Sequence, residues 1–359
     1  MRKIWHIALL AVLGAAFLSS CRERQRVEVP ETSGYASYAQ YFDVLPEGAV
    51  VSLNPYDGST DTLRVTEPLR KMVCMSTSHV GFLDAIGAAD AVAAVSGCDF
   101  VSSPRVRERI SEGLVAEAGY DAAPAYETLY QLQPDVVLSY SLGGDSPMDQ
   151  RLRDLGIRVF TLYEHLESHP LARAEYVRLF GALTGRMAAA DSLFAVVSSS
   201  YLSLAAPSSS KMPVAKDGLK KVLVNLPYAG VWYIPGAESY MARLIRDAGG
   251  EVLGAEPGTS QSGMISLEEA YRLACEADWW LNAGSVRSLD ELRRENAAFA
   301  SFPVAAPGRV YTNDRRSTPG GGNDFWESGA VRPDLILKDL RTIFAGGPED
   351  SLYYYRAVR

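Results

Sequence analysis

The sequence of 359 residues contains few cysteines and few histidines, four of each. Cys21 lies at the end of an N-terminal apolar stretch, and the other three are Cys74, Cys98 and Cys275. Three cysteines cannot all pair within one chain, and no spacing among them corresponds to a zinc site. Cys74 and Cys98 each come at the end of an apolar run typical of a parallel strand, so these two are either a disulfide pair or buried free thiols.

Sequence motifs of common enzyme classes are also missing. No G-x-G-x-x-G follows an apolar run and no G-x-S-x-G is present, which argues against dinucleotide-binding and serine-hydrolase enzymes. His165 and His169 lie one helical turn apart, a spacing that can hold a metal ion, but the second half of the chain supplies no carboxylate–histidine partner. We therefore predict no catalytic residue, no metal site and no cofactor. A zinc- or manganese-ion binding protein and an enzyme on a two-lobed α/β fold are the alternative interpretations.

Basic residues are outnumbered, with 35 lysines and arginines against 43 aspartates and glutamates and a formal net charge of −8. An acidic chain argues against nucleic acid as a partner and against a broad electrostatic contact with a membrane. The length, together with 47% hydrophobic residues, allows a large core to be buried. We expect two domains and a monomer.

Residues 1–20 have the pattern of an export signal. They begin with Arg2 and Lys3, continue with an apolar stretch too short to span a bilayer comfortably, and end in small residues before Cys21. The segment LSSC resembles the bacterial lipobox, whose cysteine is lipidated and becomes the new N-terminus; the alternative is an ordinary signal peptide followed by an unrelated cysteine. Residues 21–34 are charged and predict a solvated tether that could reach at most about 45 Å. We therefore predict an exported lipoprotein anchored to the membrane and facing the periplasm.

Two stretches, PAYETLYQLQPDVVLSYS at 124–141 and ISLEEAYRLACEADWWLNAGS at 265–285, share one pattern. In each, a glutamate, Glu127 or Glu268, lies three residues before a tyrosine, and an aspartate then precedes an apolar run. Helical spacing followed by a short apolar run predicts a helix that leads into a strand buried on both faces. Such units are typical of parallel sheets, and their presence in both halves indicates two similar lobes.

The remaining pattern predicts an α/β fold: two Rossmann-like lobes with parallel sheets, joined by a single long α-helix and preceded by a short N-terminal β-ribbon. The first lobe should begin with a strand at MVCM, a loop at STSHVGF and a helix through LDAIGAAD. Two helical stretches, with a break at Thr184 and Gly185, should connect the lobes. The expected parts are the ribbon at 35–69, the N-terminal lobe at 70–169, the linker helices at 170–206, and the C-terminal lobe with its closing helix at 207–359.

The order of these pieces resembles the periplasmic substrate-binding proteins of ABC importers for iron siderophores, haem and cobalamin. RKMVCMSTSHVGFLDAIGAADAVAAVSG resembles their opening, YETLYQLQPDVVLSYS their signature of Glu followed by Leu-x-Pro-Asp, and RPDLILKDLRTIF their closing helix. The resemblance runs from about Arg70 to Phe344, and the ribbon before it departs from the family's minimal form. It implies a ligand clamped in a cleft between the lobes, little hinge motion, and delivery of a large metal chelate to an ABC importer permease.

The resemblance also implies two contacts with the permease, because in such proteins a surface glutamate on each lobe docks onto permease arginines. Glu127 matches the first by its distance from Pro134, and Glu268 matches the second through its SLEE context. Glu269 is a rival for the second position. The alternative is that these are solvated glutamates at helix N-termini, where the helix dipole favours them.

Residues in loops after the expected strands are candidates for ligand contact, because parallel sheets present ligand groups there. His79 either faces a ligand or is a hydrogen-bonded structural histidine. Three aromatic residues follow KVLVNL: Tyr228, Trp232 and Tyr233. They suit a planar or partly apolar ligand such as a porphyrin, a corrin or a catecholate chelate, although core packing can explain two of them. Arg315 and Arg316 can bind carboxylate or phosphate, or lie in a solvated loop. The predicted ligand-binding residues are Ser78, His79, Tyr140, Tyr228, Trp232, Tyr233, Arg315, Arg316 and Trp326.

Overall fold

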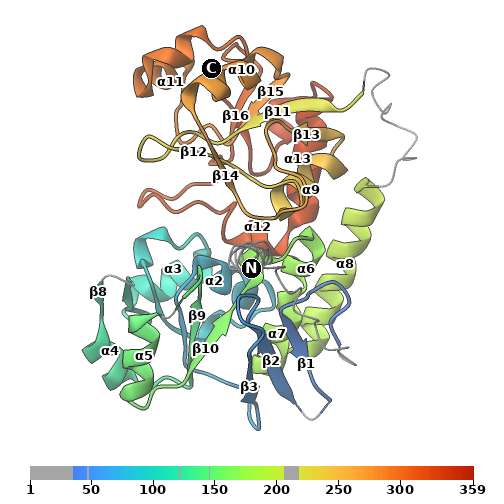
Figure 1. Ribbon diagram of the computed structural model, residues 1–359. Helices are drawn as coiled ribbons and strands as arrows, with labels where there is room; N and C mark the ends of the chain where they lie inside the picture. The colour runs from blue at the N-terminus through green and yellow to red at the C-terminus, as the bar shows by residue number, and fades with distance from the viewer. Residues whose placement is uncertain (1–34, 47, 121–122, 145, 206–217) are drawn as a thin grey trace, which may run out of the picture. The chain divides into compact units, whose positions relative to one another are not determined.

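Two lobes, each built around a five-stranded sheet, make up most of the chain (Figure 1). This arrangement confirms the predicted α/β fold with parallel sheets. The predicted signal peptide, Cys21 and the tether lie outside the residues that the structure describes. The computed structural model describes residues 35–46, 48–120, 123–144, 146–205 and 218–359.

The sheet of the N-terminal lobe is parallel throughout. Its strands are β4 Met72–Cys74, β5 Val92–Val95, β6 Ala116–Glu117, β9 Val136–Tyr140 and β10 Val159–Leu162. They lie in the order β10-β9-β4-β5-β6, so the first strand of the lobe is central and is buried on both faces. The helices of this lobe are α2 Thr77–Ala85, α3 Pro104–Ser111, α4 Tyr126–Leu132 and α5 Pro147–Asp154.

The sheet of the C-terminal lobe repeats the plan with one difference at its edge. Its strands are β11 Lys220–Val224, β13 Gly250–Val252, β15 Trp279–Leu281, β16 Val310–Thr312 and β17 Arg356–Ala357. The order is β13-β11-β15-β16-β17, and only the pairing of β16 with β17 in this sheet is antiparallel. The helices of this lobe are α9 Tyr240–Asp247, α10 Leu267–Glu276, α11 Leu289–Glu295, α12 Ser328–Val331 and α13 Pro333–Phe344.

The segment STSHVGF, predicted to be a loop, is instead the start of a helix. The Ser76 hydroxyl accepts a hydrogen bond from the Ser78 N–H at 3.3 Å and caps α2, so the helix begins at Thr77. Val80 and Phe82 then lie in the core. The prediction of a loop here is wrong, because Ser76 caps a helix that begins inside this segment.

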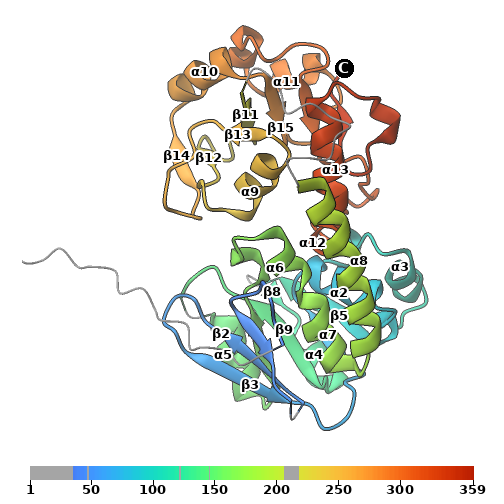
Figure 2. The same ribbon diagram turned by 90° about the vertical axis from the view of Figure 1, so that its right-hand side faces the viewer.

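The linker consists of α6 Pro170–Ala174, α7 Tyr176–Thr184 and α8 Met187–Ala205. Gly185 has φ 70° and ends α7, as the sequence predicted. The 19 residues of α8 pack against α7, which itself contacts α2 of the N-terminal lobe, and against α13 of the C-terminal lobe, so that α8 connects the two lobes (Figure 2). Among the described residues, α8 is the one helix long and apolar enough to cross a membrane by length and composition alone, but Phe194 and Val197 bury one of its faces in the protein.

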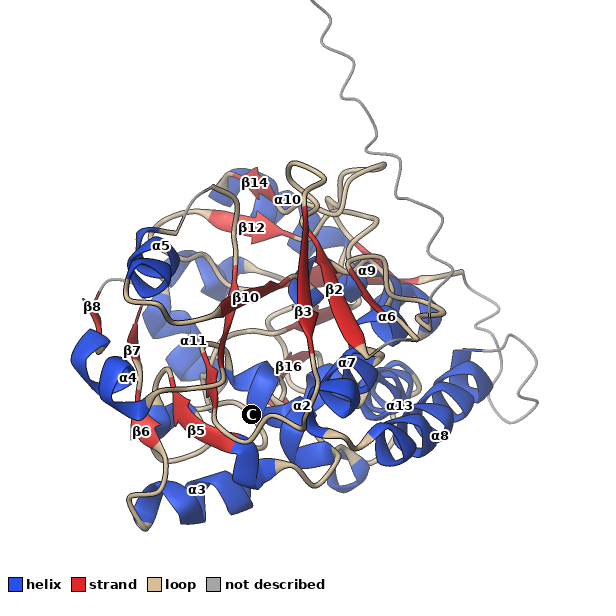
Figure 3. Cartoon of the chain, turned by 90° about the horizontal axis from the view of Figure 1, so that it is seen from below, coloured by secondary structure: helices blue, strands red, loops and turns tan. Residues whose placement is uncertain are grey.

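A three-stranded antiparallel sheet precedes the N-terminal lobe. Its strands are β1 Phe42–Val44, β2 Ala49–Leu53 and β3 Thr60–Arg64. This ribbon lies beside β10 (Figure 3), where the Ser52 hydroxyl donates to the Thr161 carbonyl at 2.6 Å. Arg158 forms an ion pair of 2.5 Å with Asp61 on β3. The ribbon is therefore part of the packed lobe.

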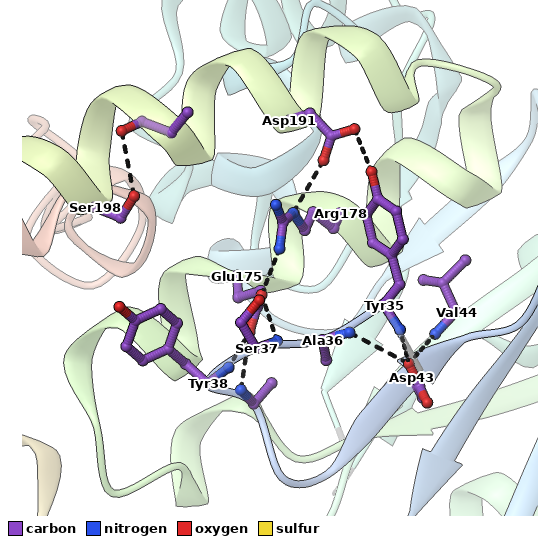
Figure 4. Close-up of polar contacts among 12 residues, drawn as sticks. Tyr35, Ala36, Ser37, Tyr38, Asp43, Val44, Glu175, Arg178, Asp191 and Ser198 are labelled. Atoms are coloured by element: carbon purple, nitrogen blue, oxygen red, sulfur yellow. Dashed lines mark hydrogen bonds and ion pairs between the residues drawn. The ribbon is translucent and has the colours of Figure 1, made fainter. Parts of the chain in front are cut away.

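The chain that leads into this ribbon is held by buried carboxylates (Figure 4). Glu175 is fully buried and accepts hydrogen bonds from the N–H groups of Ser37, Tyr38 and Ala39 at 2.7–2.9 Å. Arg178 donates to Glu175 at 2.6 Å. The first described residues are therefore fixed to the linker helices, immediately after the predicted tether.

Several short elements complete the chain. The strands β12 Trp232–Ile234 and β14 Gly263–Ile265 pair in the C-terminal lobe, and β7 Gly119–Tyr120 pairs with β8 Ala123–Pro124 in the N-terminal lobe. The 3-10 turns are η1 Ala89–Ala91, η2 Cys98–Phe100, η3 Glu164–Leu166, η4 Ala297–Ser301 and η5 Glu349–Ser351. Cys74, Cys98 and Cys275 are all free thiols. The disulfide alternative for Cys74 and Cys98 is therefore wrong, although β4 and β5 are neighbours as expected.

Candidate functional site

The carboxyl edge of the N-terminal sheet gathers polar side chains around a buried glutamate. Glu164 follows β10 and accepts a hydrogen bond of 2.7 Å from the Ser78 hydroxyl. His79 and His165 lie on either side of it, with nitrogen–oxygen distances of 3.8 and 3.9 Å. Burial alone would raise the pKa of Glu164, but the two histidines beside it outweigh burial and hold this pKa well below its usual range.

Ser78 and His79 are buried in this cluster, at 1% and 0% exposure. The His79 ring packs near Phe180, with 6.0 Å between ring centroids. The prediction that these two side chains contact a ligand is therefore corrected, because α2 points them into the lobe. Tyr140, at the end of β9, is partly exposed, and its ring meets His165 edge to face at 6.1 Å.

The two histidines considered for a metal site have other partners. The His165 Nε2 atom lies 3.0 Å from the Ser141 carbonyl oxygen. The His169 Nδ1 atom accepts a hydrogen bond from the Leu171 N–H at 3.0 Å and so caps α6. Across the described part of the chain, no three His, Cys, Asp or Glu side chains are grouped so that they could hold a metal ion.

In the C-terminal lobe, Trp232 is a core residue. It is 1% exposed, stacks on Trp280 at 5.7 Å, and donates from Nε1 to the Val224 carbonyl at 2.9 Å. The prediction that it faces a ligand is therefore wrong. Side chains alternate along β12, so Tyr233 points outward and is 39% exposed.

Tyr233 lies beside an exposed apolar residue that no sequence motif indicated. Met264 pairs with Tyr233 across the two strands of the β12–β14 sheet and is 72% exposed. Tyr228, in the loop after β11, is 79% exposed. The alternation of apolar residues in β14 is too short to have identified Met264 from the sequence.

The loop after β16 holds the two predicted arginines. Arg316 donates from Nε to Asp324 at 2.6 Å, and its guanidinium lies 4.5 Å from the centre of the Tyr353 ring. Arg315 donates to the Glu349 carbonyl at 3.2 Å. Both arginines are exposed but oriented by these partners, so their charge is held in place at the surface. The last residue of the predicted set, Trp326, is 45% exposed.

The two predicted docking glutamates lie in equivalent places. Glu127 is exposed in the first turn of α4, and Glu268 is exposed in the first turn of α10. Glu269, the rival for the second position, forms an ion pair of 2.7 Å with Arg272. Hydrogen bonds from its own N–H and from Ser266 lower the pKa of Glu268, which keeps it ionised. Geometry therefore favours Glu268 as the side chain available to a partner.

The lobes also meet at a groove that no sequence motif indicated. Its volume is about 820 Å³. It lies where η2 and α3 of the N-terminal lobe face residues 317–319 of the C-terminal lobe, directly after Arg316. The lining residues that carry charge or a thiol are Cys98, Asp99, Arg107 and Glu108.

Comparison with known proteins gives one family for most of the chain. The sequence model of the periplasmic binding protein family matches residues 72–316. An uncharacterized lipoprotein of Methanocaldococcus jannaschii is 24% identical over 288 residues, which cover 78% of this chain and 66% of the relative.

Two solved structures share the fold. The periplasmic haem-binding protein HutB of Vibrio cholerae is 19% identical with a TM-score of 0.55, over 75% of this chain and 97% of that one. The triscatecholate siderophore binding protein FeuA of Bacillus subtilis, complexed with ferri-bacillibactin, is 16% identical with a TM-score of 0.59, over 80% of this chain and 96% of that one. At these identities the likeness concerns the fold.

Proposed function

The chain belongs to the periplasmic binding protein family, and we propose that it is the solute-binding lipoprotein of an ABC importer whose ligand is a large metal chelate: haem, a ferric siderophore or cobalamin. The family match, which extends across both lobes from β4 to the loop after β16, carries this proposal. Two of the solved structures that share the fold are named for binding haem and a triscatecholate siderophore.

Exposed side chains after strands of both sheets support a ligand of this kind. Tyr228 and Tyr233 offer rings in the C-terminal lobe, and Tyr140 offers one in the N-terminal lobe. Arg315 and Arg316 offer oriented positive charge to carboxylate or phosphate groups. Together with Trp326, these side chains are the proposed ligand contacts, whereas Ser78, His79 and Trp232 support them from within the core.

The proposal includes the partners of the protein. Lipidation of Cys21 would hold it at the membrane on a short tether, and the curated relative is likewise named a lipoprotein. Glu127 and Glu268 would dock onto arginines of the permease, one from each lobe. The protein would act as a carrier without catalysing a reaction.

Direct binding measurements test the function. The mature chain is titrated with hemin, a ferric tris-catecholate and cyanocobalamin, and binding is followed by absorption spectroscopy and native mass spectrometry. We expect one of the three to bind with one ligand per chain. Binding of none of them, together with tight binding of zinc or manganese ions, would replace this proposal with the metal-ion alternative.

A further inference from the structure

The turn between β2 and β3 brings a tyrosine to the carboxyl edge of the N-terminal sheet. The Tyr56 ring packs on Gly143, where an added Cβ would lie 3.3 Å from a ring carbon. It also meets the Tyr163 ring edge to face at 6.4 Å. Gly143 follows β9 and Tyr163 follows β10, and these strands are parallel neighbours. Tyr56 therefore lies at the edge where parallel α/β sheets present ligand groups.

Hydrogen bonds within the turn fix the backbone at Tyr56. Its N–H donates to the Asn54 side-chain oxygen at 3.0 Å, and the Gly58 N–H donates to the Asn54 carbonyl at 2.9 Å. Asp57 accepts from the N–H and the hydroxyl of Ser59. A ring held in this way loses little conformational freedom when it packs against a ligand.

The position of the turn relative to the sheet is fixed as well. Ser52 and Asp61, one on each strand that leads to the turn, bond to β10 and to Arg158 just before it. The chain before β1 is held by Glu175 (Figure 4). The ribbon therefore cannot move away from the sheet without breaking these polar contacts.

An exposed apolar side chain comes directly before the glycine on which Tyr56 packs. Leu142 precedes Gly143 in the loop after β9 and is 78% exposed, and Tyr56 is 44% exposed. Tyr163, whose ring meets the Tyr56 ring, is 6% exposed and gives Tyr56 a packed base. Gly143 has φ 102°, a conformation that side chains rarely adopt, so the loop is shaped for the close approach of the Tyr56 ring.

We propose that Tyr56 and Leu142 form an additional ligand-contact surface, supplied by the ribbon and the loop after β9, on which a flat or apolar face of the chelate packs. This inference rests on the proposed function, because it assigns part of the binding site of the same carrier. The surface selects ligands with an exposed aromatic or corrin face over small hydrophilic chelates. The ribbon is thereby a specificity element and the phenol ring is its contact group.

The test compares the wild-type mature chain with Tyr56→Ala, Tyr56→Phe and Leu142→Ser. The matched control is Tyr130→Ala on α4, a tyrosine of similar exposure, at 53%. The probes are hemin, a ferric tris-catecholate and cyanocobalamin, and dissociation constants are measured by fluorescence quenching. Melting temperatures are recorded for every variant, and Leu142→Ser keeps the test informative if Tyr56→Ala unfolds.

For the probe that wild type binds, Tyr56→Ala should raise the dissociation constant about tenfold, as truncation of a buried aromatic contact does. Leu142→Ser should raise it in the same direction, while Tyr56→Phe and Tyr130→Ala should stay close to wild type. Wild-type affinity in folded Tyr56→Ala and Leu142→Ser overturns this inference and leaves the proposed function standing. Failure of wild type to bind any probe overturns the proposed function, and this inference with it.

Discussion

The carboxylate of Glu327, in the C-terminal lobe, accepts a hydrogen bond of 2.6 Å from the backbone N–H of Ser103, in the N-terminal lobe. The N–H of Ser102 donates to the same carboxylate at 2.7 Å, and Glu327 is 1% exposed. Next to it, an added Cβ on Gly81 would lie 2.6 Å from the Glu327 carbonyl oxygen, so glycine permits this close approach. The lobes are thus joined by a buried polar contact in addition to α8.

This contact predicts a pH dependence of stability. Burial raises the pKa of Glu327 from 4.5 to about 8, against the opposing effect of the two N–H groups. Because the folded chain then holds the proton more tightly than the unfolded chain, the stabilisation is complete below about pH 4.5 and is lost as the pH rises through about 8. The melting temperature should therefore fall between about pH 5 and about pH 9, and Glu327→Gln should make this fall smaller.

The control for this prediction is Glu112→Gln, an exposed glutamate at the end of α3. Burial also raises the pKa of Glu167 to about 8. Part of the fall in melting temperature with rising pH should therefore remain in Glu327→Gln. It should become smaller still in the double variant with Glu167→Gln. If the melting temperatures of wild type and Glu327→Gln change with pH in the same way, Glu327 is ionised at neutral pH in the folded chain and the prediction is wrong.

The contact between Glu175 and the chain before β1 predicts a large loss of stability on truncation. Glu175→Ala removes the acceptor of three backbone N–H groups and the partner of Arg178. The free energy of unfolding should drop on the order of 3–5 kcal/mol, as when one partner of a buried ion pair is removed. Urea unfolding measures the loss, and hydrogen exchange should show faster exchange at Ser37 to Ala39. Unchanged exchange there would mean that other contacts hold this segment.

The oriented arginines predict a dependence on ligand charge. Replacing Arg315 and Arg316 with glutamine should weaken a chelate that carries free carboxylate or phosphate groups more than a neutral one of similar size. The Tyr353→Leu variant keeps both charges but removes the ring under Arg316, and it should produce a smaller loss. Isothermal titration with hemin, which carries two free carboxylates, and with its dimethyl ester, which has the same ring without them, separates these effects. Equal losses for both ligands would place the arginines outside the ligand contact.

Sequence patterns predicted the elements but not which side chains reach the surface. Helix breaks and apolar runs are local signals, so the end of α7 at Gly185 and the run of β15 could be predicted. The orientation of Trp232 depends on Trp280 and Phe302, which are distant in the sequence and pack on it only in the fold. For the same reason no sequence pattern indicated Tyr56 beside Gly143, because that contact requires the ribbon to pack on β10.

The last prediction concerns the repeated glutamates. If Glu127 and Glu268 contact the permease, Glu127→Gln and Glu268→Gln should leave ligand affinity and melting temperature unchanged, because both side chains are exposed and on helices outside the proposed contact surface. Transport, measured as ligand uptake or as stimulation of the importer's ATPase, should fall in each variant and further in the double variant, since each removes a charge-assisted contact made only in the complex.

The matched control is Glu269→Gln, which removes a neighbouring charge that Arg272 already pairs within the helix. The Glu269→Gln variant should transport like wild type. In a separate experiment, replacing the docking arginine of the permease with an acidic residue should partly restore transport by a Glu268→Lys variant. Full transport by the Glu127→Gln, Glu268→Gln double variant would reject the docking assignment. A transport defect in Glu269→Gln but not in Glu268→Gln would instead assign the second permease contact to Glu269. The ion pair between Glu269 and Arg272 would then have to break when the protein binds its permease.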